Sequence, residues 1–133
     1  GQADVKREGR DLTIITWSRE VNFSLEAAQT LAAEGIDVEV LDLRSLVPLD
    51  WDAIVKSVSK THNVIIVSEE VKRGSYAGEL SAQIAEELFD ELDAPVERLC
   101  GLNIVSPFSP VLEDQNFPHP DTIVKAVKRV LNK

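Results

Sequence analysis

The sequence lacks methionine entirely and has only one cysteine, Cys100, among its 133 residues. A single cysteine excludes a disulfide within the chain and is compatible with a reducing compartment. A natural full-length protein normally begins with methionine, whereas this chain begins Gly-Gln-Ala. We therefore expect residues 1–133 to form one domain that has been excised or processed from a longer polypeptide.

Long apolar runs and an excess of basic residues are also missing. No stretch approaches the roughly 18 apolar residues of a transmembrane helix, and the N-terminus has no signal-peptide pattern. The formal net charge is -9, which argues against binding to nucleic acids or anionic membranes, because both need a basic surface. A basic protein partner is compatible with this charge.

The residues of the common catalytic sites are scarce as well. The segment 16–22, where we predict the first strand-to-helix turn, contains no glycine and so has no phosphate-binding loop of the usual kinds. His62 and His119 are the only histidines and are far from Cys100 in sequence, so the pattern predicts neither a metal site nor a cysteine–histidine nucleophile. We interpret His62 as a residue at a helix C-terminus and Cys100 as a buried apolar residue. The residues alone do not indicate an enzyme.

Hydrophobic periodicity predicts strands that alternate with helices. We expect strands at 12–17, 38–43, 63–67 and 96–99, and helices at 23–34, 51–60, 79–92 and from 121 onward. The expected helix N-caps are Ser24, Asp50 and Asp121. A short strand at Asp4–Arg7 is expected to form an antiparallel hairpin with the first main strand. A proline-punctuated connection at 101–119 is expected to be irregular.

This order of elements predicts an α/β fold. Strands that alternate with helices indicate a three-layer α/β/α sandwich around a mostly parallel sheet, with right-handed crossovers. The unbroken apolar run at 63–67 is typical of a central parallel strand that is covered on both faces.

Two charged features are candidates for function. Asp42 and Arg44 follow a strand, and open α/β sheets bind ligands and partner domains at the carboxyl ends of strands. Two interpretations of Arg44 stay open: it holds an anion or a neighbouring domain, or it pairs with Asp42 or the glutamates after residue 67. The second feature is an acidic face, most often only solvated, whose functional interpretation is docking of a basic partner. Its members are Glu86, Glu87, Asp90, Glu91 and Asp93.

An ordered set of short motifs resembles the C-terminal domain of transketolase-like proteins. The resemblance is closest to the beta subunit of the thiamine-dependent decarboxylase component of 2-oxo acid dehydrogenase complexes, and it covers essentially the whole chain. It is carried by VEVLDLRSLVPLD at 38–50 and by motifs at 5–9, 25–28, 67–69, 74–79, 92–96, 107–108 and 112–113. Two segments depart from the family pattern, namely GSYAG at 74–78 and NIVS at 103–106.

The resemblance implies a mixed five-stranded sheet with four parallel strands and one antiparallel edge strand. In the parent enzyme it implies thiamine diphosphate and magnesium, held between the alpha subunit and an N-terminal pyrimidine-binding domain of the beta subunit. That domain has no counterpart within residues 1–133, so we expect no catalytic residue, cofactor or metal in this chain. The implied parent reaction is oxidative decarboxylation of a 2-oxo acid, with acyl transfer to lipoyl groups.

The resemblance also implies partners and contact residues. The partners are the alpha subunit and the subunit-binding domain of the acyltransferase core, with a homodimer as a further option. Asp93 lies in a matched motif and is the main docking candidate, followed by Glu91 and Lys133, whereas Arg44 is assigned to bracing a loop or a neighbouring domain. The implied location is the bacterial cytoplasm, with the mitochondrial matrix as the alternative.

Several functional alternatives stay open at this point. One alternative is that the chain is the C-terminal domain of another transketolase-like enzyme. The other is a non-catalytic module that binds a small ligand. The substrate of the parent enzyme also stays open among pyruvate, branched-chain oxo acids and, for related acetoin-cleaving complexes, acetoin.

Overall fold

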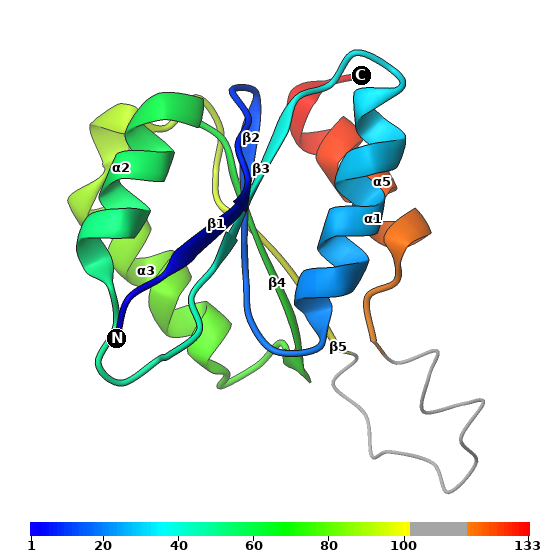
Figure 1. Cartoon of the computed structure of the whole chain (residues 1–133). Helices are drawn as coiled ribbons and strands as arrows, with labels where there is room; N and C mark the ends of the chain where they lie inside the picture. The colour runs from blue at the N-terminus through cyan, green and yellow to red at the C-terminus, as the bar shows by residue number, and fades with distance from the viewer. Residues whose placement is uncertain (102–116) are drawn as a thin grey trace, which may run out of the picture.

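The computed structural model describes residues 1–101 and 117–133. These residues form a five-stranded sheet with helices on both faces (Figure 1). The strands are β1 (Asp4–Arg7), β2 (Leu12–Thr16), β3 (Val38–Asp42), β4 (Val64–Val71) and β5 (Glu97–Gly101). The helices are α1 (Glu20–Ala32), α2 (Trp51–Thr61), α3 (Tyr76–Glu87) and α5 (Pro120–Leu131), with a short 3-10 helix η1 (Phe89–Glu91).

The sheet has the strand order β1-β3-β2-β4-β5. Strands β2, β3, β4 and β5 run parallel, and β1 pairs with β3 in the antiparallel sense. Helices α1 and α5 cover one face, while α2 and α3 cover the other (Figure 1). The predicted three-layer sandwich, with one antiparallel edge strand on a mostly parallel sheet, is confirmed.

The predicted hairpin between β1 and β2 is wrong, because β1 pairs with β3 instead. The segment between β1 and β2, residues 8–11, contacts the start of β3 and the residue before it. The Asp11 backbone N–H donates to the Asp37 carbonyl oxygen (2.8 Å), and Gly9 packs directly on the backbone of Val38 and Glu39. These contacts carry the chain across β3, so that β3 lies between β1 and β2.

Several predicted helix boundaries also change. Helix α1 begins at Glu20 rather than residue 23, so Ser24 is buried inside the helix and is not its cap. Helix α5 begins at Pro120 with His119 as N-cap, which places Asp121 in the first turn. The prediction for Asp50 is confirmed, since its carboxylate accepts a hydrogen bond from the Ala53 backbone N–H (3.1 Å).

The third helix and the strand before it differ from the prediction as well. The segment predicted as one helix at 79–92 is two elements: α3 ends at Glu87, and η1 follows. Strand β4 extends to Val71, into the segment predicted as a loop. The irregular connection, apart from its ends, and the motifs at 103–113 lie outside the described residues.

The core consists of two apolar clusters, one on each face of the sheet. Strand β4 contributes to both: Ile65 and Val67 belong to the cluster under α1 and α5, and Val64 and Ile66 to the cluster under α2 and α3. All four side chains are fully buried. This alternation confirms the prediction of a central strand that is covered on both faces.

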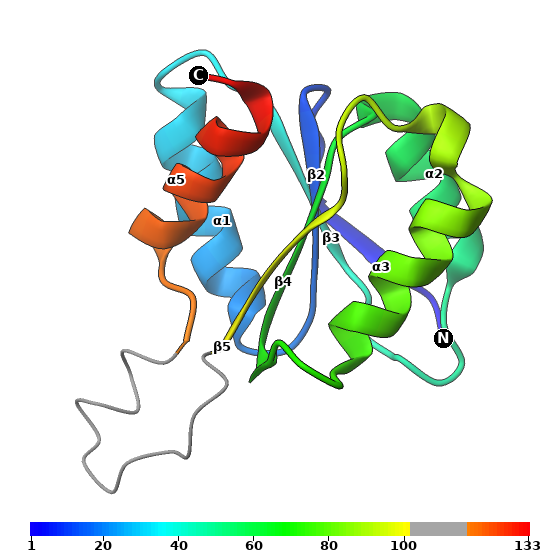
Figure 2. The same cartoon turned by 180° about the vertical axis from the view of Figure 1, so that it is seen from behind.

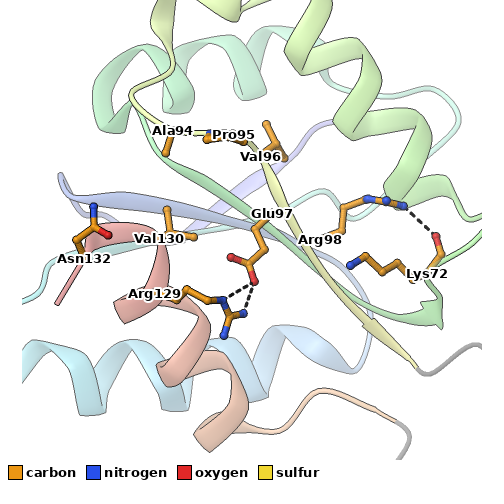
Figure 3. A pocket seen from close by; sticks show the side chains of 9 residues that line it. All are labelled: Lys72, Ala94, Pro95, Val96, Glu97, Arg98, Arg129, Val130 and Asn132. Atoms are coloured by element: carbon orange, nitrogen blue, oxygen red, sulfur yellow. Dashed lines mark hydrogen bonds and ion pairs between the residues drawn. The ribbon is translucent and has the colours of Figure 1, made fainter.

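Strand β5 forms the edge of the sheet opposite β1. Within the described residues it pairs only with β4. Glu97 of this strand points to α5 and forms an ion pair with Arg129 (Figure 3). The C-terminus lies at the same end of the molecule as the turn that precedes β5 (Figure 2).

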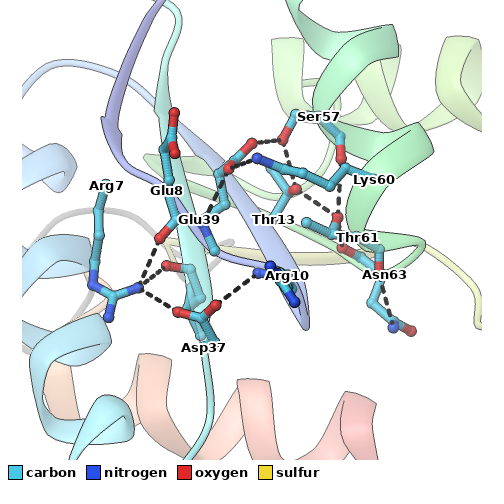
Figure 4. Close-up of polar contacts among 12 residues, drawn as sticks. Arg7, Glu8, Arg10, Thr13, Asp37, Glu39, Ser57, Lys60, Thr61 and Asn63 are labelled. Carbon is cyan, nitrogen blue, oxygen red and sulfur yellow. Dashed lines mark hydrogen bonds and ion pairs between the residues drawn. The ribbon is translucent and has the colours of Figure 1, made fainter.

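A buried polar network joins the N-terminal strands to α2 (Figure 4). The Glu39 side chain is 2% exposed. Its carboxylate accepts hydrogen bonds from the Gly9 backbone N–H (3.1 Å), the Ser57 hydroxyl (2.6 Å) and the Lys60 ammonium group. Thr13 of β2 extends the network through its hydroxyl contact with Ser57 (2.7 Å).

Gly9→Ala tests this arrangement. A Cβ atom at position 9 would lie 2.5 Å from the Glu39 backbone nitrogen and closer still to the Val38 carbonyl carbon. Backbone atoms cannot yield like a flexible side chain, so we expect the free energy of unfolding to fall by about 1–3 kcal/mol. Urea denaturation measures this change. The control Glu8→Ala, at the exposed neighbouring residue, should stay within about 0.5 kcal/mol of the parent.

Candidate interaction site

The acidic surface consists of Glu86, Glu87, Asp90, Glu91 and Asp93. Because α3 ends at Glu87, these residues follow a helix end, η1 and the turn after it rather than one helical face. All are exposed except Glu91, which is half-buried. Within the described part of the chain, only Glu91 has a basic side chain within ion-pair distance, the His62 ring at 3.7 Å, which carries a charge only when protonated. The other four carboxylates have no ion-pair partner among the described residues.

His62 holds the segment that carries Glu91 and Asp93. It is the C-cap of α2 and has a left-handed backbone with φ +62°. Its ring nitrogen Nδ1 lies 2.7 Å from the Glu91 carbonyl oxygen. Its own carbonyl oxygen accepts a hydrogen bond from the Asp93 backbone N–H (2.8 Å). The helix-end position predicted for His62 is thus confirmed, and its ring also anchors the acidic surface to α2.

Two grooves meet at the segment Ala94–Val96. The groove on the α3 side includes Asp93, and the groove on the α5 side includes Asn132, next to the last residue Lys133. Figure 3 shows Ala94 to Val96 on one wall of the α5-side groove, with Arg129, Val130 and Asn132 on α5 and its end. His62 therefore holds the backbone of both Glu91 and Asp93, while Lys133 is placed only by its neighbour Asn132 in the other groove.

Arg44 lies elsewhere. It follows the carboxyl end of β3, whereas Asp93 precedes the amino end of β5. Because these strands are parallel, the two residues lie toward opposite ends of the strands. Arg44 is exposed and has a left-handed backbone with φ +59°. Its backbone N–H donates a hydrogen bond to the Asp42 carboxylate (3.0 Å). The role of its guanidinium as a brace for a loop or neighbouring domain stays a prediction.

Glu20 was missed by the sequence reasoning. It is the first residue of α1 and has no solvent exposure. Neither carboxylate oxygen has a hydrogen-bond partner among the described residues, and the same holds for the hydroxyl of Ser24 one turn later. Burial raises the pKa of the Glu20 carboxyl to about 7, and the nearby Glu69 carboxylate adds to this effect, while Arg19 and His119 oppose it.

The described residues do not fit a metal centre or a reactive thiol. They contain no group of three or more histidine, cysteine, aspartate or glutamate side chains that could hold a metal ion. Cys100 is half-buried against the core cluster under α2 and α3, and burial raises the pKa of its thiol. We therefore place no step of magnesium or thiamine diphosphate chemistry on these residues. No helix in the described ranges is long and apolar enough to cross a membrane.

The mixed five-stranded sheet and its two helical layers define a small α/β domain. Comparison with known families is more specific. The chain belongs to the family "Transketolase, C-terminal domain", whose model matches residues 1–123.

Curated relatives agree with this family. The chain is 48% identical over its whole length to acetoin:2,6-dichlorophenolindophenol oxidoreductase subunit beta of Bacillus subtilis. Over 98% of its length, it is 46% and 49% identical to the pyruvate dehydrogenase E1 component subunits beta of Saccharomyces cerevisiae mitochondria and Porphyra purpurea. The chain spans only 36% to 40% of the length of these relatives.

A solved structure supports the same assignment. The chain matches a structure described as a split gene transketolase, inactive beta4 tetramer, with a TM-score of 0.82 and 30% sequence identity. The match covers 98% of this chain and 42% of that one. A transketolase of Pichia stipitis, at 15% identity and a TM-score of 0.67, shares the fold.

Glu20 should make stability depend on pH. Its folded-state pKa of about 7 lies above the ordinary value of 4.5, so between these values the folded state binds more protons than the unfolded state. The free energy of unfolding should therefore fall as the pH rises from about 4.5 to about 7, and stay low above. Glu20→Gln removes this decline and should be the more stable protein at pH 8, by at most about 3 kcal/mol.

Urea denaturation of parent and variant between pH 4.5 and pH 8 measures this difference. The matched control is Glu26→Gln, at an exposed position on the same helix, which should keep the pH dependence of the parent. Parallel curves for the parent and Glu20→Gln would contradict the prediction.

Proposed function

We propose that this chain is the C-terminal assembly and docking domain of the beta subunit of a thiamine diphosphate-dependent 2-oxo acid dehydrogenase. The observation that carries the proposal is identity of 46% and 49% to two pyruvate dehydrogenase E1 beta subunits over nearly the whole chain, beside 48% to a beta subunit of an acetoin oxidoreductase. The acidic surface, four of whose five carboxylates have no ion-pair partner among the described residues, supports the docking part. The bacterial cytoplasm is the proposed location, with the mitochondrial matrix as the alternative, because relatives of both origins are similar.

The proposal assigns the chemistry to the rest of the enzyme. The parent enzyme would carry out oxidative decarboxylation of a 2-oxo acid and transfer the acyl group to a lipoyl group. Thiamine diphosphate and magnesium would be held by the alpha subunit and the remainder of the beta subunit, and this domain would contribute to assembly. The names of the relatives cover acetoin, pyruvate and 2-oxoisovalerate, and the proposal is limited to this class of substrates.

Asp93 is the central residue of the proposed docking surface. Its carboxylate is exposed, and its backbone is fixed by the hydrogen bond to His62, so the charge is presented in a defined position. The carbonyl oxygen of Glu91 contacts the His62 ring, and Lys133 follows Asn132, which lines the groove on the other side of Ala94–Val96. The partner with matching chemistry is a basic surface, proposed to be the subunit-binding domain of the acyltransferase core. Exposed charge pairs contribute only about 0–1 kcal/mol each, so several must act together.

A second candidate is the C-terminal domain of a different transketolase-like enzyme. It is favoured by the structural match to a split gene transketolase at a TM-score of 0.82. This candidate predicts no affinity for a subunit-binding domain. The docking experiment below therefore separates the two functions.

Asp93→Lys tests the docking surface. Titration calorimetry with the subunit-binding domain of a bacterial dihydrolipoamide acyltransferase should show binding to the parent chain that weakens as salt is added. The variant loses an attraction and gains a repulsion, so its affinity should be about 3- to 10-fold lower at low salt. The matched control Glu26→Lys changes the charge equally on α1 and should bind like the parent. Equal affinities for parent and Asp93→Lys would remove Asp93 from the interface.

Cofactor binding provides a separate test. The chain alone should give no calorimetric response to thiamine diphosphate with magnesium, because the proposal places both on other parts of the enzyme. Binding of thiamine diphosphate to the chain alone with a micromolar dissociation constant would contradict this division of roles. The alpha subunit, added in place of the cofactor, tests the assembly role in the same instrument.

A further inference from the structure

The most exposed aromatic side chain of the described residues lies beside the acidic surface. Phe89 is 73% exposed and is the first residue of η1. It lines the α3-side groove together with apolar side chains from α3 and from the turn before β5. The complete lining consists of Ser81, Ala85, Phe89, Leu92, Asp93, Ala94, Pro95 and Val96.

The exposure of Phe89 follows from the way α3 ends. Leu80, Ile84 and Leu88 form the buried stripe of this segment, and Phe89 follows directly after Leu88, outside that stripe. The chain then turns into η1 instead of continuing the helix, and His62 fixes the end of η1 through Glu91. Phe89 therefore does not pack into the core. An exposed aromatic group in an apolar groove with a polar rim is typical of an interaction surface.

The charges around the groove indicate its occupant. Asp93 is part of the lining, and Asp90 adjoins Phe89 in η1, whereas none of the described lining residues is basic. A second copy of this chain would bring the same carboxylates face to face, at a net charge of -9 on each copy. A basic partner with an apolar side chain at its centre meets both requirements, because its cations face the aspartates while its apolar group fills the groove.

We infer that Phe89 is the apolar anchor of the docking surface. An apolar side chain of the basic partner packs against Phe89 and Leu92 in the α3-side groove, and lysine or arginine side chains around it meet Asp90 and Asp93. This inference rests on the proposed function and adds to it the residue that holds the partner. Exposed ion pairs give little affinity, whereas a buried aromatic group at the centre of an interface is the usual dominant contact.

Phe89→Ala tests the inference in calorimetry with the same subunit-binding domain, at low and high salt. The affinity should fall about 10- to 100-fold, the range of a lost central aromatic contact. The fold-loss should be similar at both salt concentrations, because apolar contacts are not screened, while the effect of Asp93→Lys should shrink in high salt. Phe89→Leu keeps an apolar group and should lose less affinity than Phe89→Ala.

Val47→Ala is the matched control. Val47 is 88% exposed and follows the carboxyl end of β3, far along the chain from the groove, so this truncation should leave the affinity unchanged. Since Phe89 is also exposed, its truncation opens no core cavity, and circular dichroism with urea denaturation should show parent-like stability for Phe89→Ala.

The outcomes separate this inference from the proposed function. Binding by the parent that is unchanged in Phe89→Ala overturns the inference and leaves the docking function intact. Absence of binding by the parent overturns the docking function, and the inference with it. A parent chain that sediments as a dimer, and becomes monomeric in Phe89→Ala without losing affinity for the subunit-binding domain, would identify a second copy as the occupant and overturn the inference.

Discussion

A buried carboxylate fixes the relative positions of three parts of this domain. Removing Glu39 from water is unfavourable unless its oxygens are hydrogen-bonded, and the three donors come from the link after β1 and from α2. The same carboxylate therefore seats the N-terminal link against β3 and clamps the second half of α2 onto the sheet. Removal of any one of the three donors would leave the buried Glu39 carboxylate with too few hydrogen bonds, so each donor is needed for the stability of the whole network.

The acidic surface depends on this network through α2. Ser57, Lys60 and Thr61 are bonded to the sheet side of the network, and the next residue, His62, holds the backbone of the 91–93 segment. A continuous set of contacts thus runs from a charge inside the protein to the charges displayed outside it. The backbone of Glu91 and Asp93 is thus hydrogen-bonded to the end of α2, and a surface segment that is held before binding loses less entropy on binding.

The sequence predicted those parts of the fold that depend on local signals. The apolar run at 63–67 and the cap at Asp50 are read from a few neighbouring residues, and both are confirmed. The partner of β1 could not be read locally, because it is decided by contacts of Gly9 and Asp11 with residues about 30 positions away. The start of α1 was missed because the side chain of its N-cap residue, Arg19, makes no capping hydrogen bond. Phe89 stands outside the buried stripe and was visible in the sequence, but its exposure depends on where α3 ends.

The parallel direction of the strands has a consequence for how the domain can be used. Arg44 and the buried Glu20 follow the carboxyl ends of β3 and β2. The acidic surface and Phe89 lie at the other end of the strands, where β5 begins. The length of the strands separates these two ends, so a protein seated at one end does not block access to the other. Under the proposed function, partners at the two ends would not compete: the domain would stay attached to its own catalytic subunits while the core of a larger assembly is exchanged at the opposite end.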